Sequence, residues 1–597
     1  MTDSAPGADA YLGVERSLAG RRWSLRPADD RTARALEQTQ ALDPLVARVL
    51  VARGIDLAQA ETFLAPSLRS SLPNPSVLRD MDRAVEAIVE AVQTGRTIAV
   101  FGDYDVDGAT SAALLSRYLG AVTGQPPLLY VPDRIKEGYG PNPTAMRRLR
   151  ERGADLVISV DCGIVAFDAL DVAAETGLDA VIIDHHAAES RLPVARAVVN
   201  PNRLDDDSGL GHLAACGVVF LVLVAVNRRL REAGMFQDRA EPDLLSLLDL
   251  VALGTVCDVV PLIGLNRALV AQGLKIMAQR RTVGLDALMA AARLIDRPTA
   301  YHAGYILGPR INAAGRIGQA DLGARLLSTE DGGEARMIAE QLNAHNEDRK
   351  AIQEQVLAEA DDQVAGQTGP VIVVAGEGWH PGVIGVVAGR LRELYDRPAC
   401  AVALEGGIGK ASGRSMPGID LGAAVIEARR AGLLLAGGGH PMAAGFTVAA
   451  VKLAALRDYL NRHVAAQGGG PAVPSLDLDG ALSVGGATTA FAESIERLAP
   501  FGPGNEEPCF VLRHARVVKP SIVGAGHVRC WLTGAGTERL KAIAFRAGET
   551  QVGDALLAGT GAPLHLAGRL RIDRWQGRVQ PQFQIEDAAP AWGQGTE

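Results

Sequence analysis

In the first half of the chain, short apolar runs alternate with stretches whose apolar residues recur at helical spacing. The runs 98–101, 156–160 and 179–183 have the length and composition of buried parallel strands, and 81–95 reads as an amphipathic helix. Such alternation predicts parallel strands joined by right-handed crossovers. We therefore expect an α/β domain over residues 76–328, whose later part is mostly helical.

The pattern changes several times after this domain. A highly charged helical pattern over 329–367 is predicted to connect two lobes, although a solvated surface helix has the same pattern. A second, smaller α/β pattern covers 368–467. Beyond it, 468–597 opens with a Gly- and Pro-rich linker and continues with five short strands, which suggest a small barrel with an OB-fold as one candidate. Residues 1–75 read as a leader and a small helical region.

Composition narrows the class of protein. A chain of 597 residues with 48% hydrophobic residues predicts several globular domains. The net charge of −9 argues against coating nucleic acid by bulk charge, but it allows a local basic groove. Six dispersed cysteines without a CxxC pair fit free thiols in a reducing cytoplasm. The longest apolar run, 213–226, is too short to span a bilayer, and the start of the chain lacks a signal pattern.

Metal-capable side chains follow several of the predicted strands. They are Asp103, Asp105 and Asp107 after the first strand, Asp161 after the second, Asp184, His185 and His186 after the third, and Asp258 in a fourth candidate strand within 250–262. Ligands bind at the carboxyl ends of strands in open α/β sheets, and oxygen ligands suit Mg²⁺ and Mn²⁺. Helix capping explains one acidic strand end, but four in one domain favour a metal site.

These ligand types favour a site for two metal ions. A bridging carboxylate can hold two ions about 3.5–4 Å apart, and such a pair clamps the attacking and leaving oxygens of a phosphoryl centre. Mixed histidine and aspartate ligands favour Mn²⁺ over Mg²⁺, though weakly. A satisfied histidine pair at a strand end is the alternative for His185 and His186.

The motifs DYDVDG, SVDCG and DHH resemble the signatures of the DHH phosphoesterase superfamily. The similarity extends through GTVCDVVPL, LGPRINAAGR, WHPGVIGVVAGR, ASGRS and GGGHPMAAGF, and thus covers about residues 75–450. The order of the motifs and the overall length resemble the single-strand-specific 5′→3′ DNA exonucleases of that superfamily. By this resemblance 76–328 is a DHH domain, 368–467 a DHH-associated substrate-binding domain and 468–597 a nucleic-acid-binding OB-fold, the last mainly through APFGPGNEEPCF.

The resemblance implies a ligand set. Asp105 and Asp161 would hold one ion, and Asp107, Asp161, His185 and Asp258 the other, with Mn²⁺ or Mg²⁺ as the metal. His186 would lie beside the scissile phosphate as an electrostatic or acid group. Some members carry a histidine four positions before the first liganding aspartate, where this chain has Phe101. Two alternatives follow. Asp103 compensates for the missing histidine as a member of the catalytic set, or the first ion arrives with the substrate.

The second lobe supplies candidate phosphate-binding residues. In GGGH, glycines allow close backbone approach to a phosphate and His440 can donate to it, although a tight turn also uses such glycines. The resemblance assigns the terminal 5′-phosphate and first nucleotides to a set whose arginines suit bidentate capture. The set is Arg310, Ser412, Arg414, Gly438, Gly439 and His440, and Arg134 and His380 are further candidates to line the same cleft.

The five C-terminal strands combine basic and aromatic residues. A basic groove with stacking aromatics suits single strands, although an ordinary barrel also has aromatics in its core. The basic residues are Arg513, Arg516, Lys519, Arg529, Lys541, Arg546, Arg569, Arg571, Arg574 and Arg578, and the aromatic ones are Phe501, Trp531, Phe545 and Trp575.

The sequence and the resemblance together predict a metal-dependent exonuclease of DNA repair and recombination. It would degrade single-stranded DNA from the 5′ end to nucleoside 5′-monophosphates. Its partners would be single-stranded DNA with a 5′ end, with single-strand-binding protein and a repair helicase as further candidates and no membrane. One alternative is a phosphodiesterase or phosphatase acting on short oligonucleotides or cyclic dinucleotides. Another is a non-catalytic nucleic-acid-binding replication scaffold, for which we would expect ligand aspartates to be lost.

Overall fold

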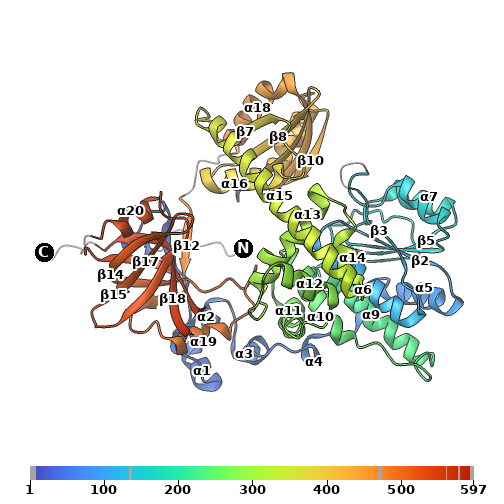
Figure 1. Cartoon of the computed structure of the whole chain (residues 1–597), viewed down its shortest axis with the longest axis horizontal. Coiled ribbons are helices and arrows are strands. Elements are labelled where there is room, and N and C mark those ends of the chain that lie inside the picture. The colour runs from blue at the N-terminus through green and yellow to red at the C-terminus, as the bar shows by residue number, and fades with distance from the viewer. Residues whose placement is uncertain (1–8, 134–136, 468–472, 560, 576–577, 592–597) are drawn as a thin grey trace. The chain divides into compact units, whose positions relative to one another are not determined.

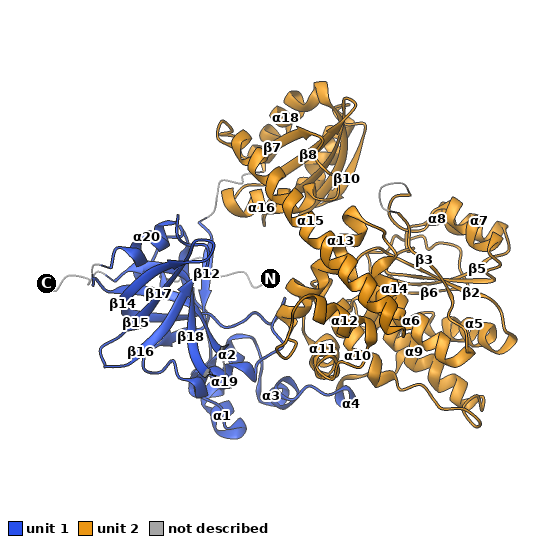
Figure 2. Ribbon diagram, in the orientation of Figure 1, with its two compact units in different colours: residues 1–70, 472–597 blue, residues 71–471 orange. Residues whose placement is uncertain are grey.

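A computed structural model describes residues 9–133, 137–467, 473–559, 561–575 and 578–591 (Figure 1). The chain forms two compact units (Figure 2). One unit is continuous and covers residues 71–471. The other combines residues 1–70 with 472–597, so it draws on both ends of the sequence.

The larger unit begins with a parallel sheet of five strands. Its strand order is β3-β2-β4-β5-β6, and every neighbouring pair is parallel. Every residue of β2 and β4 is buried, as expected for central strands covered on both faces. The strands are β2 (Ile98–Gly102), β3 (Leu128–Tyr130), β4 (Leu156–Val160), β5 (Asp179–Ile183) and β6 (Ala197–Val199).

Helices cover both faces of this sheet (Figure 1). Helices α7 and α8 share one hydrophobic core with β2, β4 and β5, whereas α5, α6 and α9 contact strands and one another in a second layer. The helices are α5 (Met81–Thr94), α6 (Val106–Thr123), α7 (Pro143–Glu151), α8 (Phe167–Glu175), α9 (Ala215–Glu232), α10 (Leu248–Cys257), α11 (Gly264–Met277), α12 (Val283–Ala291), α13 (Gly308–Ile317) and α14 (Leu322–Ser328). A short π-helical turn, His302–Leu307, precedes α13.

The prediction of a fourth strand within residues 250–262 was wrong. Its residues form most of helix α10, which ends at Cys257 with Asp258 as its C-cap. Leu248 to Thr255 are all buried, so no polar face marks the helical period. A short, uniformly apolar run fits a buried helix and a buried strand equally well, which explains the error.

The predicted connecting helix is α15 (Gly332–Val364), 33 residues long. Asp331 caps it by accepting a hydrogen bond from the Glu334 amide at 2.6 Å. Its second half joins the core of the smaller lobe, where Trp379 Nε1 donates to Glu359 Oε2 at 2.7 Å. One continuous helix therefore carries packing contacts with both lobes of this unit.

The smaller lobe contains a five-stranded sheet of order β10-β11-β9-β8-β7, in which only β7 and β8 pair in parallel. The GGGH motif lies in β10, at the edge of this sheet. The elements are β7 (Ile372–Glu377), α16 (Ile384–Tyr395), β8 (Ala399–Glu405), β9 (Ile408–Arg414), α17 (Leu421–Arg430), β10 (Ala436–His440), β11 (Ala443–Ala449) and α18 (Leu453–Ala466).

The second unit is built on the predicted barrel. All five predicted strands are present as β14 to β18, and pairing of β14 with both β15 and β17 curls the sheet. The elements are β12 (Ser475–Leu478), β13 (Gly480–Leu482), α19 (Thr489–Glu496), β14 (Phe510–Val523), β15 (His527–Thr533), β16 (Arg539–Ala544), α20 (Gln551–Leu557), β17 (Leu564–Trp575) and β18 (Arg578–Pro590).

The N-terminal segment is part of the barrel unit. Its strand β1 pairs in parallel with β12, and its helices α1 and α2 bury leucine and valine side chains in the barrel's core. The fully buried Asp587 accepts hydrogen bonds from Ser17 Oγ at 2.6 Å and from Trp23 Nε1 at 3.0 Å. The elements are β1 (Arg22–Leu25), α1 (Asp30–Gln40), α2 (Pro44–Ala52), α3 (Leu57–Leu64) and α4 (Leu68–Ser71).

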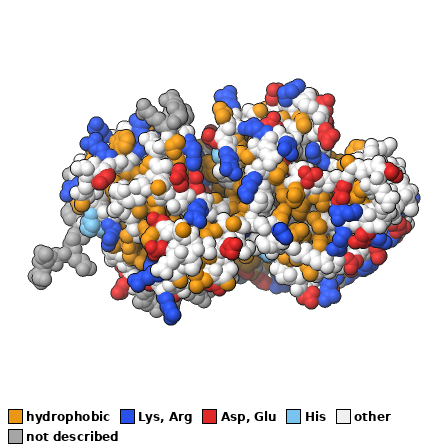
Figure 3. All heavy atoms as spheres, turned by 90° about the horizontal axis from the view of Figure 1, so that it is seen from below, with side chains coloured by type: hydrophobic (Ala, Val, Ile, Leu, Met, Phe, Trp, Pro, Cys, Tyr) orange, Lys and Arg blue, Asp and Glu red, His pale blue; other side chains and the backbone are white. Residues whose placement is uncertain are grey.

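Charge and hydropathy on the outside of the chain are mixed. Acidic and basic side chains are interspersed over the face seen in Figure 3. Across the described residues, no helix combines the length and the apolar composition needed to cross a lipid bilayer.

Candidate metal centre

The carboxyl ends of β2, β4 and β5 bring the predicted acidic motifs together. These three strands are neighbours in the sheet, so the residues that follow them meet at one edge. Asp103 and Asp105 follow β2, and Asp161 follows β4 with a left-handed φ of 60°. Ligand atoms of Asp103, Asp105 and Asp161 lie within 4.8 Å of one another.

Asp105 and Asp107 are held by backbone amides at helix N-termini. Asp105 is the N-cap of α6 and accepts from the Gly108 amide at 3.0 Å. The carboxylate of Asp107, in the first turn of α6, accepts from the amides of Ala215 at 2.6 Å and Cys216 at 2.9 Å. These amides begin α9, whose own N-cap, Ala214, makes no side-chain cap. A distant aspartate therefore caps α9 and is fixed by it.

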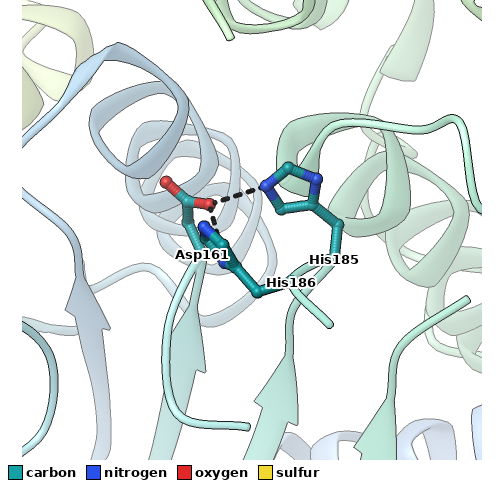
Figure 4. A group of neighbouring side chains, drawn as sticks. All are labelled: Asp161, His185 and His186. Carbon is teal, nitrogen blue, oxygen red and sulfur yellow. Dashed lines mark ion pairs between the residues drawn. The ribbon is translucent and has the colours of Figure 1, made fainter. Parts of the chain in front are cut away.

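Three of the predicted aspartate ligands approach the imidazole of His185, and Figure 4 shows one of them, Asp161, beside His185 and His186. Its Nε2 lies 3.3 Å from Asp161 Oδ1, 3.7 Å from Asp258 Oδ2 and 4.0 Å from Asp107 Oδ2. Asp107 and Asp161 are buried, and Asp258 is partly buried at the end of α10. Side chains from two strands and two helices thus surround one small volume.

The converging atoms lack the hydrogen bonds that buried polar atoms normally make. Asp161 Oδ1, His185 Nε2 and Asp258 Oδ2 are buried, and among the described residues none has a hydrogen-bond partner. Leaving such atoms unsatisfied costs free energy, and oxygen and imidazole ligands suit Mn²⁺ and Mg²⁺. The donor set therefore fits divalent ions.

Crowded carboxylates favour a cation at this place. Burial raises the pKa of Asp161 well above its usual range, and the carboxylates of Asp105 and Asp107 raise it further. Burial likewise raises the pKa of Asp107, and it raises the pKa of Asp258 to about 8 with the help of neighbouring aspartates. A divalent ion would relieve this repulsion and desolvation.

His186 is oriented differently from His185. Its Nδ1 lies 2.8 Å from Asp184 Oδ1, and Asp184 also accepts from the backbone amides of both histidines. Burial alone would lower the pKa of His186, but the bond to Asp184 prevails and raises it to about 9. Because Nδ1 faces Asp184, the orientation of the ring is fixed and its protonated form is favoured.

Some residues that shape the site were missed by our reading of the sequence. Asn200 Nδ2 donates to the carbonyl of His186 at 2.9 Å, and Asn202 Nδ2 donates to the carbonyl of His185 at 2.5 Å. Tyr139 Oη donates to the backbone carbonyl of Asp161 at 3.3 Å, and its ring lies edge-on to that of His186. The asparagines follow strand β6, so applying the strand-end argument to that strand would have found them.

Phe101, which replaces a histidine of some superfamily members, is a core residue. It is fully buried in β2, and its ring stacks on Tyr130 with centroids 5.4 Å apart. It offers no ligand atom, so Asp103, Asp105 and Asp161 make up the described carboxylate cluster on this side.

Candidate phosphate-binding residues of the smaller lobe lie on β9 and β10, the two strands on either side of β11. Ser412 and Arg414 lie on β9, where Arg414 Nη1 donates to Ser412 Oγ at 2.9 Å. Gly438 lies on the edge strand β10, and a Cβ added there would meet nothing within 4 Å. At Gly439 a Cβ would lie 2.5 Å from the Ala443 carbonyl oxygen, so close strand pairing requires glycine there. His440 is exposed at the end of β10.

The remaining candidates lie elsewhere. Arg310 Nε donates to Asn343 Oδ1 at 3.0 Å, where α13 packs along α15. His380 Nδ1 accepts from the Gly382 amide at 3.0 Å, and burial lowers its pKa. Arg134 falls outside the described residues.

Some of the barrel's basic residues are ion-paired, others line a pocket, and Lys541 does both. Arg569, Arg571, Arg574 and Lys541 form ion pairs with acidic residues of the same unit. By contrast, Lys519, Arg529 and Trp531 line a pocket of about 440 Å³ together with Pro520, Ser521, Cys530 and Lys541. Trp531 and Phe545 are exposed, whereas Phe501 packs against the core. The side chains of Trp575 and Arg578 lie outside the described ones.

Divalent metal is expected to raise the melting temperature of this protein. Ligand at 100 times its dissociation constant stabilises the folded state by about 2.7 kcal/mol. Differential scanning fluorimetry with and without Mn²⁺ measures the shift. Asp161→Asn should abolish it and also raise the melting temperature without metal, because one crowded carboxylate is gone. Asp168→Asn, an exposed change on α8, should keep the full shift. An undiminished Mn²⁺ shift in Asp161→Asn would contradict the site.

Comparison with known proteins assigns three segments to family models. Residues 97–255 match the DHH family N-terminal domain, 368–466 the DHHA1 domain, and 478–587 the RecJ OB domain. The single-stranded-DNA-specific exonuclease RecJ of Bacillus subtilis is 34% identical over 578 residues, which are 95% of this chain and 71% of that protein. The exonuclease of the same name from Escherichia coli is 34% identical over 570 residues, 92% of this chain and 96% of that one.

Solved structures give the same result. RecJ from Thermus thermophilus in complex with Mn²⁺ superimposes with a TM-score of 0.78 at 30% identity, covering 95% of this chain and 78% of that one. The Mg²⁺ complex of the same protein gives a TM-score of 0.73 at 28% identity, covering 96% and 78%. The likeness extends over both units of the chain.

Proposed function

Since this chain belongs to the RecJ family of single-stranded-DNA-specific exonucleases, we propose how its own residues carry out that reaction. The protein is a metal-dependent exonuclease of single-stranded DNA, and its cofactor is Mn²⁺ or Mg²⁺. The observation that carries the proposal is the convergence of unsatisfied buried ligand atoms on His185 Nε2. A site of this kind fits cleavage of a phosphodiester.

We propose that Asp107, Asp161, His185 and Asp258 hold one ion and that Asp103, Asp105 and Asp161 hold a second. Asp161 would belong to both sets, because its carboxylate clusters with Asp103 and Asp105 and its Oδ1 lies 3.3 Å from His185 Nε2, and it would then be shared by the two ions. When bound, such ions supply Lewis-acid stabilisation of the phosphoryl oxygens and make water a stronger acid. The buried aspartates contribute a fixed, negatively charged frame that keeps the ions in position.

His186 is the group we propose to act on the leaving oxygen. Asp184 orients it and keeps it protonated, so its Nε2–H can donate to the oxygen released when the P–O bond breaks. Water adds to phosphorus in the same displacement. The Tyr139 ring beside the imidazole limits its movement.

We further propose that the strand is read from its 5′ end. Ser412, Arg414 and the exposed GGGH edge of the smaller lobe offer hydroxyl, guanidinium and close backbone approach, which together suit a terminal phosphate. The basic and aromatic pocket on the barrel suits the strand further along.

A location in the cytoplasm agrees with six free cysteines. Single-strand-binding protein and a repair helicase remain expected partners from the resemblance alone.

Strands labelled at one end test the direction of cleavage. With 5′-³²P-labelled single strands and Mn²⁺, we expect labelled mononucleotide from the first time points, because the terminal nucleotide leaves first. The same strand labelled at its 3′ end should yield shortened products before labelled mononucleotide. Release of the 3′ label first would refute the polarity. Preferential hydrolysis of a dinucleotide over the long strand would favour the small-substrate alternative.

Arg414→Gln is expected to remove the preference for a 5′-phosphate over a 5′-hydroxyl. Loss of a charge-assisted contact costs about 10- to 100-fold in affinity. KM for the phosphorylated strand should therefore rise by that factor, while kcat changes little. The matched control is Arg430→Gln, an exposed arginine of the same lobe that pairs with Glu427. A preference that survives Arg414→Gln would remove this residue from the terminal pocket.

A further inference from the structure

The buried stripe of α15 changes character halfway along the helix. Its early members, among them Ala335, Ile338 and Leu342, are apolar and buried in the larger lobe, and its late members, Val356, Ala360 and Val364, enter the smaller lobe's core. At the same three- and four-residue spacing between them stand Asn346, Arg349 and Gln353. The inward face is therefore polar where the helix passes from one lobe to the other.

Arg349 is the charged member of this polar stretch. Its hydrogen-bond partners are neutral, and the Glu347 carboxylate acts on it through charge alone, beyond ion-pair distance. Its Nη1 donates to Gln353 Oε1 at 2.9 Å and its Nη2 to Asn346 Oδ1 at 3.0 Å. Its Nε is buried and, among the described residues, has no hydrogen-bond partner. Two of five donors are engaged, and the described chain places no carboxylate at ion-pair distance.

A second guanidinium reaches the same stretch from the neighbouring helix. Arg310 of α13 donates to Asn343 Oδ1 at 3.0 Å and to the Ile306 carbonyl at 2.6 Å, again to neutral acceptors. Asn343 lies one turn before Asn346 on α15, so the two cations are about one helical turn apart. The nearby Glu347 is exposed and pairs with Lys350 at 3.0 Å. Burial lowers the pKa of both arginines.

Helix α13 connects this pair to the metal centre and to the smaller lobe. A Cβ at Gly308 would collide with Cys257 Sγ, next to Asp258, and one at Gly315 would lie 3.0 Å from the Tyr104 carbonyl oxygen. Next to Gly315, at the C-terminal end of α13, Arg316 Nη1 donates to the Gly382 carbonyl at 3.0 Å. The helix thus lies against the metal-binding loops and against the lobe that carries the proposed 5′-phosphate pocket.

We propose that Arg349, paired with Arg310, binds a backbone phosphate of the single strand between the 5′-terminal pocket and the metal centre. The inference rests on the proposed function. Burying a cation that has no carboxylate at ion-pair distance costs free energy, which a bound anion would offset. Two guanidiniums about one helical turn apart suit binding to a phosphodiester backbone. The hydrogen bonds to Asn346 and Gln353 fix the Arg349 guanidinium in an orientation in which it can bind that anion.

The alternative is that Arg349 only braces its own helix, and salt dependence separates the two roles. A phosphate contact releases counterions, so its loss should make log(kcat/KM) fall less steeply with log[salt], by about 0.7. The assay measures degradation of a 5′-phosphorylated single strand by the full chain with Mn²⁺ across a range of salt concentrations. For Arg349→Gln we expect KM about tenfold higher or more, kcat within about twofold, and the shallower slope.

Arg349→Lys and Lys350→Gln complete the test. Lysine keeps the charge but cannot bridge Asn346 and Gln353 as the guanidinium does, so a phosphate contact predicts that it restores the slope. Lys350→Gln removes an exposed charge one position along and should leave KM and slope unchanged. The inference is overturned if the salt slope of Arg349→Gln equals that of the wild type. It is also overturned if the Gln and Lys variants lose the same melting temperature and neither changes the slope. A wild type that fails to degrade single strands overturns the proposed function instead.

Discussion

Asp161→Asn is expected to abolish cleavage of single-stranded DNA, by about 10³-fold or more in kcat. In the proposed ligand sets Asp161 is shared, so one substitution would remove a charge from each ion site. Lewis-acid stabilisation by such ions is worth several kcal/mol, and each 1.4 kcal/mol is a factor of ten in rate. Quantifying mononucleotide release at saturating DNA and Mn²⁺ checks this outcome.

The choice of asparagine keeps the test free of folding defects. Asp161 adopts a φ of 60°, a conformation that asparagine tolerates and alanine does not. The side chain also keeps its size in a site that is almost fully buried. The Asp168→Asn control should retain wild-type kcat. Activity within tenfold of wild type in Asp161→Asn, with metal-free stability intact, would rule out Asp161 as the shared ligand.

His186→Gln is expected to lower kcat by about 10²- to 10⁴-fold with little change in KM. This is the usual contribution of a proton donor positioned at the leaving oxygen. Glutamine can still bond to Asp184 but cannot carry the proton, so binding of DNA and metal should persist. Single-turnover rates with prebound strand separate the chemical step from product release.

A substrate with a bridging 3′-sulfur provides the sharper comparison. A thiolate leaves without protonation, so loss of the proton donor should cost much less on this linkage than on the normal one. His302→Gln, a partly buried histidine on the π-helical turn, is the matched control and should behave as wild type on both substrates. An equal loss in His186→Gln on both linkages would show that the imidazole acts by electrostatics and not as an acid.

Much of the site could be predicted because it obeys a topological rule. Asp105, Asp161 and His185 follow neighbouring parallel strands, and a pattern of apolar runs locates those strand ends from sequence. Asp258 was predicted to lie at the end of a strand, whereas it is the C-cap of α10, because a uniformly buried helix has no polar face to reveal its period. Its arrival beside His185 depends on packing of α10 against α6, which no local pattern encodes.

Other parts of the structure depend on contacts between residues far apart in the chain. Asp107 caps α9 from a position more than one hundred residues away, and only the missing cap at Ala214 hints at it. In the sequence, Arg349 is one of many charged residues on a helix that could be solvated. Its position on the inward face becomes evident only when the structure shows which side of α15 is buried. The union of the N-terminal segment with the barrel likewise left no trace in hydropathy.

That union has a consequence for synthesis on the ribosome. Trp23 and its hydrogen-bond partner Asp587 are synthesised far apart in time, because the whole unit of residues 71–471 lies between them in the sequence. At about 5–20 residues per second, the leading segment waits roughly 20–80 s for the strands that complete it. During this interval its apolar helices lack the barrel core against which they pack, so chaperone capture of nascent chains should concentrate on this segment.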